Sequence, residues 1–216
     1  MKMKEMREKP LVTGETALLF IDVQNYSAHR EGGTFAGMEN DEKEKRYGWF
    51  FQELEGRVLP NMKALLDACR GAGVEVLYTV IESLTRDGRD NSLDYKISGF
   101  HVPRGSWDGK VLDAIAPGED EIVLPKTSSS VFISTNLDYI LRNLGVRQLV
   151  LSGLLTDQCI ESAIRDGADL GYLVTQATDA CLTHSAERQE NSLRTIAGYC
   201  RQKTTAELLE ELRPSP

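Results

Sequence analysis

Three residues of this chain have side chains that could together cleave a carbonyl compound by thiol attack. Asp22 ends the apolar run ALLFID, Lys126 follows the run EIVLP, and Cys159 lies shortly after a further run in LVLSGLLTDQC. A cysteine can attack a carbonyl carbon, and a carboxylate can accept the thiol proton and later deliver it to a leaving amine. A nearby ammonium can hold the carboxylate and the developing charge in place. This chemistry does not require a histidine base.

Each of these residues also has an ordinary structural interpretation. An aspartate after a strand is commonly a turn or helix cap, a loop lysine is usually solvated, and a cysteine is often a small buried apolar group. The chemical interpretation requires that the fold bring the three together. Near a helix N-terminus, backbone amides and an ammonium both favour a thiolate, so we expect the pKa of Cys159 to be lowered.

The pattern of apolar residues indicates how the fold could bring these positions together. Apolar runs bounded by turn signals predict buried strands at 17–21, 74–80, 121–124, 148–151 and 172–176. Segments with helical spacing, each followed by glycine, lie at 58–69, 133–144 and 160–170. Strands without a polar face must be covered on both sides, which favours an α/β fold with one doubly wound parallel sheet and helices on both faces. Ligands bind beyond the carboxyl ends of such strands, where all three residues fall.

The rest of the chain fits one domain over residues 1–216. Its core covers about 16–198, and a C-terminal helix and tail cover 199–216, with the helix at 204–212. Two long segments, 29–46 and 84–107, are predicted to be irregular loops. Loops of this length in compact domains often act as lids or binding loops.

Composition excludes several classes of protein. The chain has 33 acidic and 25 basic residues, a net charge of −8 and no dense basic run, so we expect no nucleic-acid partner. No apolar run approaches the roughly 18 residues of a membrane span, and we expect no membrane partner. The N-terminus MKMKEMREKP lacks the apolar stretch of a secretory signal, and four sparse cysteines show no C-x-x-C pairing. These features predict a cytoplasmic protein with free thiols.

Three blocks of the sequence resemble the isochorismatase-like cysteine hydrolases. They are ALLFIDVQN, VLPKTSSSVF and SGLLTDQCIESAIRDGADLGYLVTQATDA, in that order, and the resemblance covers roughly 16–198. The third is the most specific, because G-x-x-T-D-x-C followed by a helix and a D-A strand end is a signature of the family. The resemblance implies a catalytic triad of Asp22, Lys126 and Cys159. It also implies a cis peptide bond at Leu154-Leu155 and an oxyanion hole formed by the backbone amides of Leu155 and Cys159.

The family includes nicotinamidases, amidohydrolases of N-carbamoylsarcosine, biuret and ureidoacrylate, and isochorismatases that cleave a vinyl ether. The presence of Cys159 favours a hydrolase that cleaves a C–N bond of a small amide or ureide through a thioester, releasing ammonia or an amine, and the histidine pattern described below makes it metal-independent. Two alternatives remain: a vinyl ether hydrolase, which needs the aspartate but not the thiol, and a non-catalytic binding protein. The resemblance further implies a homodimer or homotetramer in which a neighbouring subunit helps to close the site.

Metal binding is not expected. Nicotinamidases of this family bind a metal through an aspartate and histidines in and after the loop that follows the second strand. No histidine lies between Tyr78 and Phe100 here, and no H-x-H or H-x-x-x-H spacing occurs. We therefore expect neither a metal nor another cofactor. The three histidines are predicted to be surface or supporting residues: His29, His101 and His184.

Several residues near the predicted strand ends are candidates for substrate binding. Gln24 and Asn25 offer amides after the first strand, and Phe132 could wall an apolar pocket. Arg86 and Arg89, in RDGRDN, have planar guanidiniums that suit a carboxylate or ureido group. The alternative is that these arginines only pair with neighbouring carboxylates of Asp87, Asp90 or Asp94.

Overall fold

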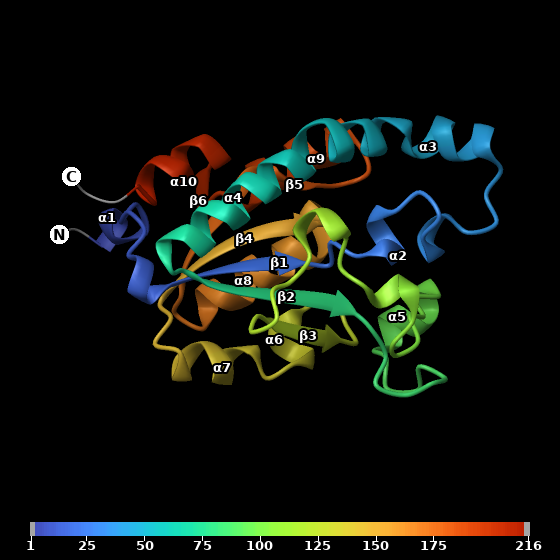
Figure 1. Ribbon diagram of the computed structural model, residues 1–216, viewed down its shortest axis with the longest axis horizontal. Coiled ribbons are helices and arrows are strands. Elements are labelled where there is room, and N and C mark those ends of the chain that lie inside the picture. Colours follow the sequence, from blue (N-terminus) through green and yellow to red (C-terminus); the bar gives the residue numbers. More distant parts are fainter. Residues whose placement is uncertain (1–2, 214–216) are drawn as a thin grey trace.

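Six parallel strands form one sheet in the computed structural model of the chain, which describes residues 3–213 (Figure 1). The order across the sheet is β3-β2-β1-β4-β5-β6. The strands are β1 (Thr16–Ile21), β2 (Glu75–Ile81), β3 (Ile122–Lys126), β4 (Gln148–Leu154), β5 (Leu173–Leu182) and β6 (Arg201–Lys203). The order changes direction between β1 and β4, and ligands of open parallel sheets bind beyond such a switch point.

Helices cover both faces of the sheet, so the predicted doubly wound α/β fold is confirmed. Successive residues of β1 point to opposite faces: Leu18 and Phe20 belong to a core cluster that includes residues of α4 and α10, whereas Leu19 and Ile21 belong to one that includes residues of α7 and α8. Figure 1 shows α4 and α10 on one side of the sheet and α6 and α7 on the other. The helices are α1 (Met3–Arg7), α2 (Asn25–Ala28), α3 (Asn40–Glu53), α4 (Leu59–Ala72), α5 (Leu93–Ser98), α6 (Val131–Ser134), α7 (Leu137–Asn143), α8 (Glu161–Asp169), α9 (Ala186–Ile196) and α10 (Thr205–Glu211).

The predicted loop at 29–46 is wrong for residues 40–46, which are the first turns of α3. This helix continues through a π-helical turn (Leu54–Val58) into α4 as one long rod (Figure 1). Most side chains of its first turns are exposed, and the buried Lys43 donates a hydrogen bond to the carbonyl oxygen of Arg30 at 2.8 Å. Phe50 and Phe51 enter the core only later. The apolar periodicity that would reveal a helix is therefore missing at its start.

Other elements differ from the sequence predictions in extent. The edge strand β6 is short and polar and was not predicted, and β5 continues beyond Gln176 because it pairs with β4 again after a bulge. The predicted helix over 133–144 is divided into α6 and α7, and the segment 84–107 contains α5.

The predicted C-terminal helix is α10, which begins with a capping box formed by Thr204 and Glu207. Residues 214–216 of the predicted tail lie outside the described residues. No helix in the described range 3–213 is both long and apolar enough to cross a membrane.

Candidate active site

The carboxyl ends of β1 and β3 and the turn after β4 bring Asp22, Lys126 and Cys159 into contact. Lys126 Nζ lies 2.8 Å from Asp22 Oδ2 in an ion pair and donates a hydrogen bond to Cys159 Sγ at 3.4 Å. All three side chains are buried, with exposed fractions of 2% for Asp22, 0% for Lys126 and 5% for Cys159. The lysine thus links the carboxylate and the thiol at the switch point of the sheet.

Asp22 is held by contacts with the neighbouring strand β2. Its backbone N–H donates to the carbonyl oxygen of Thr79 at 3.0 Å, and Oδ1 accepts a hydrogen bond from Thr79 Oγ1 at 2.9 Å. Its φ of 56° lies in the left-handed region, which aspartate adopts more readily than most residues. Oδ2 is buried and accepts no hydrogen bond of good geometry from the described residues. This oxygen is therefore open to a proton from the site.

Cys159 lies in a π-helical turn (Thr156–Ile160) between β4 and α8. The peptide bond Leu154-Leu155 before this turn is cis, as the family resemblance implied. At Gly153, near the end of β4, a Cβ atom would lie 2.2 Å from the carbonyl oxygen of Ile21, and φ is 138°. Only glycine allows β4 to approach β1 this closely just before Asp22.

The expected lowering of the pKa of Cys159 is wrong. The pKa of this thiol is raised to about 11, mainly by burial; the positive charge of Lys126 opposes this rise and the negative charge of Asp22 adds to it. Burial also tends to lower the pKa of Lys126, but the negative charges of Asp22 and of the Cys159 thiolate outweigh burial and raise it. The site at neutral pH therefore holds a neutral thiol beside an ammonium, and any reaction of the sulfur as a nucleophile would require loss of the thiol proton.

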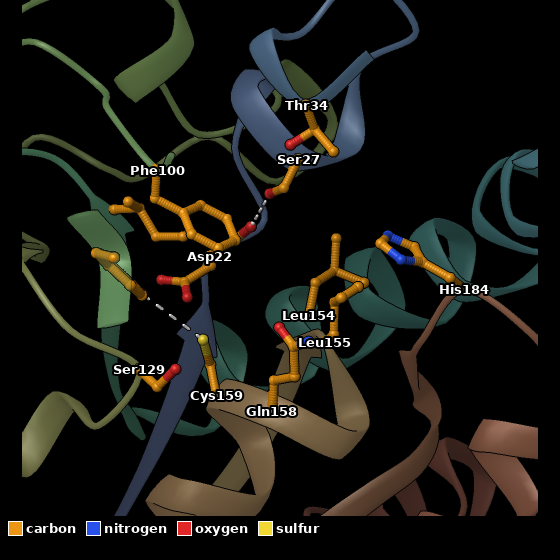
Figure 2. Close-up of a pocket in the computed structure, with 12 residues that line it drawn as sticks. Asp22, Ser27, Thr34, Phe100, Ser129, Leu154, Leu155, Gln158, Cys159 and His184 are labelled. Atoms are coloured by element: carbon orange, nitrogen blue, oxygen red, sulfur yellow. Dashed lines mark hydrogen bonds between the residues drawn. The ribbon is translucent and has the colours of Figure 1, made fainter. Parts of the chain in front are cut away.

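A cavity opens beside Asp22 and Cys159 (Figure 2). In Figure 2 these two side chains lie at one end and His184 at the other. The apolar part of the wall consists of Ile81, Tyr95, Phe100, Leu154 and Leu155. The uncharged polar part, with His184, consists of Ser27, Thr34, Ser129 and Gln158. A small molecule bound in this cavity would lie next to the sulfur of Cys159.

Several predicted substrate-binding residues do not line this cavity. The amide of Gln24 donates to the carbonyl oxygens of Ile81 and Asp108, and that of Asn25 to the carbonyl oxygen of Trp107. Both amides thereby hold the chain around Asp22 instead of facing the cavity. Phe132 stacks on Tyr172 in the core cluster that includes residues of α7 and α8.

The two predicted arginines are also outside the cavity. Arg86 and Arg89 are exposed, and Arg89 forms an ion pair with Asp87 at 3.0 Å. For Arg89 the structure therefore favours the alternative interpretation, a local ion pair.

His184 is the histidine whose placement departs from a surface role. Its ring packs edge-on against Tyr47 and Phe50, with centroid distances of 5.1 and 5.2 Å. Burial, with a contribution from Arg188, lowers its pKa to about 4, so the ring is uncharged at neutral pH. Among the described residues, no group of three or more histidine, cysteine, aspartate and glutamate side chains is arranged to hold a metal ion.

Tyr95, on α5, contacts both Lys126 and Cys159, and the sequence did not indicate it as a site residue. Its hydroxyl accepts a hydrogen bond from Lys126 Nζ at 2.8 Å and lies 4.0 Å from Cys159 Sγ. It comes from the segment that the sequence predicted to be irregular. The only signal was its position after the second strand, in a segment that could reach the carboxyl edge of the sheet.

Known proteins resemble this chain in sequence and in fold. A family model, described as the isochorismatase domain, matches residues 16–208. The chain is 31% identical over 186 residues to ureidoacrylate amidohydrolase RutB of Rhizobium rhizogenes, covering 79% of this chain and 71% of that protein. Its structure is similar to a cysteine hydrolase from Pseudomonas syringae pv. phaseolicola, with a TM-score of 0.80, 26% identity and coverage of 94% of this chain and 95% of that chain. It shares its fold with N-carbamoylsarcosine amidase from Thermoplasma acidophilum, with a TM-score of 0.64, 23% identity and coverage of 88% and 96%. The chain belongs to the isochorismatase family.

Proposed function

We propose that this protein hydrolyses a C–N bond of a small amide or ureide by covalent catalysis, without a metal or other cofactor. Cys159 is the nucleophile, Asp22 carries the proton, and Lys126 holds both in place. The observation that carries the proposal is the pair of contacts from one buried ammonium to the carboxylate, at 2.8 Å, and to the sulfur, at 3.4 Å. Similarity to ureidoacrylate amidohydrolases supports the same class of reaction.

The first half of the reaction forms a thioester. Because the resting thiol is protonated, its proton passes to Asp22 as sulfur bonds to the carbonyl carbon. The backbone N–H groups of Leu155 and Cys159 stabilise the resulting oxyanion; both residues line the cavity. Protonated Asp22 then delivers its proton to the leaving nitrogen as the C–N bond breaks, and ammonia or an amine departs.

The second half of the reaction regenerates the enzyme. Asp22, now ionised, accepts a proton from a water molecule whose oxygen bonds to the thioester carbon. The C–S bond breaks, an acid leaves, and the sulfur takes its proton back from Asp22. Lys126 remains charged throughout, and one carboxylate serves both halves.

The walls of the cavity favour a substrate whose acyl part is uncharged. The described lining residues include no lysine or arginine, and the pKa of His184 is lowered to about 4, so this ring adds no charge at neutral pH. A carboxylate entering this part of the cavity would lose its hydration without gaining a cation. Apolar groups would contact Leu154, Leu155 and Phe100 instead.

The proposal is tested with a panel of small amides and ureides, followed by ammonia release and by the intact mass of the protein during turnover. We expect hydrolysis of at least one uncharged member and a covalent adduct on the Cys159 peptide. Cys159→Ala should abolish both, whereas Cys200→Ala, which changes a buried thiol outside the cavity, should abolish neither. Hydrolysis that survives Cys159→Ala would contradict the proposal, as would cleavage of vinyl ethers alone. No turnover of any member would favour a binding protein.

A further inference from the structure

The Lys126 ammonium donates hydrogen bonds to three acceptors and also forms the ion pair with Asp22 Oδ2 at 2.8 Å. Nζ donates to the Tyr95 hydroxyl at 2.8 Å, to the carbonyl oxygen of Ser128 at 2.8 Å and to Cys159 Sγ at 3.4 Å. An ammonium has no further hydrogen to donate. The two oxygen acceptors therefore restrict the rotation of the group about its last bond, and the third hydrogen is left for Cys159 Sγ and the Asp22 carboxylate. Of these two oxygen acceptors, the Tyr95 hydroxyl belongs to a side chain and the Ser128 oxygen to the backbone.

The position of Tyr95 is itself closely controlled. Ser92 caps α5 by accepting a hydrogen bond from the Tyr95 backbone N–H at 3.2 Å, and its own N–H donates to the carbonyl oxygen of Thr127 at 2.8 Å. The start of the helix is thus attached to the residue that follows Lys126. The ring of Tyr95 packs against Phe100, with centroids 4.9 Å apart, and is almost fully buried.

The hydroxyl of Tyr95 has one hydrogen of its own. Because its oxygen already accepts from Lys126, this hydrogen is available to another acceptor, and Cys159 Sγ lies 4.0 Å away. That distance is the outer limit for a hydrogen bond to sulfur, and a negative charge on the sulfur favours a shorter one. The hydrogen bond from the Lys126 ammonium polarises the Tyr95 hydroxyl, and this polarisation strengthens the hydrogen bond that the hydroxyl donates in turn. Burial raises the pKa of Tyr95, so the hydroxyl keeps its hydrogen.

We infer that Tyr95 is a positioning residue that directs the Lys126 ammonium at Cys159 and donates its own hydrogen to the sulfur when the thiolate forms. This inference rests on the proposed role of Cys159 as nucleophile. The other ionisable groups around the sulfur are Asp22, which directly follows β1, and Lys126 from β3, and His184 lies at the far end of the cavity.

Replacing Tyr95 by phenylalanine removes the hydroxyl and keeps the packed ring. Lys126 loses a hydrogen-bond acceptor whether Cys159 is a thiol or a thiolate. The loss of the hydroxyl as a donor, however, destabilises only the thiolate. The pKa of Cys159 should therefore rise. A rise of about one unit lowers the thiolate fraction tenfold, and the greater nucleophilicity of a more basic thiolate reduces the loss of alkylation rate to about threefold.

The experiment measures the rate of iodoacetamide alkylation at the Cys159 peptide between pH 7 and 10. Tyr95→Phe should be about threefold slower than wild type across this range, and kcat should fall while KM stays unchanged. Tyr78→Phe is the matched control, because it removes the hydroxyl of another buried tyrosine, one that does not line the cavity. Its alkylation rate should equal that of wild type.

Two outcomes separate this inference from the proposed function. Equal alkylation rates in Tyr95→Phe and wild type would overturn the role of Tyr95 and leave Cys159 as nucleophile. Wild-type Cys159 that reacts no faster than the other buried cysteines would overturn both. If Tyr95→Phe does not fold, fluorinated tyrosine introduced at position 95 keeps the ring and makes the hydroxyl a stronger donor. Alkylation should then become faster, and an unchanged or slower rate would overturn the inference.

Discussion

Replacing Asp22 by asparagine should change alkylation and hydrolysis in opposite directions. The negative charge of Asp22 is one cause of the raised pKa of Cys159, so its removal should lower that pKa and expose more thiolate to a small alkylating reagent. Hydrolysis, by contrast, should be lost, because asparagine cannot carry the proton to the leaving nitrogen. Asparagine tolerates the left-handed backbone of this position and can still accept the hydrogen bond from Thr79, so the variant should fold.

The size of the effect follows from two distances in the site. Lys126 Nζ lies 2.8 Å from Asp22 Oδ2 and 3.4 Å from Cys159 Sγ. The carboxylate oxygen and the sulfur are then at most about 6 Å apart, where two unit charges repel by about 3 kcal/mol at an effective dielectric constant of about 20, or about two pKa units. Two units would raise the thiolate fraction about 100-fold, and the lower nucleophilicity of the less basic thiolate reduces the gain in rate to about tenfold.

The assay compares wild type, Asp22→Asn and Asp138→Asn with iodoacetamide at pH 8 and with the substrate found in the amide panel. Asp138→Asn is the control, because it removes a carboxylate from an ion pair on α7. It should leave both rates unchanged, whereas Asp22→Asn should alkylate about tenfold faster and hydrolyse about 100-fold slower or worse. Slower alkylation in Asp22→Asn would refute the charge argument. Retained hydrolysis would refute the role of Asp22 as proton carrier.

Four further results are expected. Asp22→Asn and Cys159→Ser should each remove most activity, and the double variant should lose little more, since the residues act as one unit; additive losses in kcat/KM would mean separate roles. Extensive chelation should leave both the melting temperature and turnover intact, and activity that depends on a stoichiometric metal would contradict metal independence. In a matched pair of substrates, the uncharged one should have the higher kcat/KM, and preference for the carboxylate would show that another group supplies a cation. Light scattering should give a multiple of 24.0 kDa, since Leu93 and Ile97 on α5 are 73% and 76% exposed; a fully active species of 24.0 kDa would show that one chain builds the site.

The strand ends of the site could be predicted because they depend on local patterns. Asp22 and Lys126 each follow an apolar run that pairs inside the sheet, and Cys159 lies in a short motif with fixed spacing. Parallel strands bring such ends to one edge whatever the details of packing. The same logic fails for β6, whose three polar residues have no apolar pattern to detect.

The electrostatics of the site could not be predicted in this way. The pKa of Cys159 depends on how completely β1, β3 and α5 cover the sulfur, and these elements are far from it in sequence. A helix start favours the thiolate, but burial and the charge of Asp22 prevail. Tyr95 was missed for a related reason, because its contact with Lys126 requires the attachment of α5 to Thr127.

The cavity is built from two kinds of segment, which differ in how much change of sequence they tolerate. Asp22 directly follows β1, and Cys159 lies in the turn between β4 and α8, close to Gly153, where the packing of β4 against β1 permits no side chain. Thr34, Phe100 and His184 stand in connections outside the strands and longer helices, and such connections accept sequence change more readily than a core does. After a gene duplication, one copy could therefore acquire a new preference for its acyl group by altering these connections while inheriting the reaction unchanged.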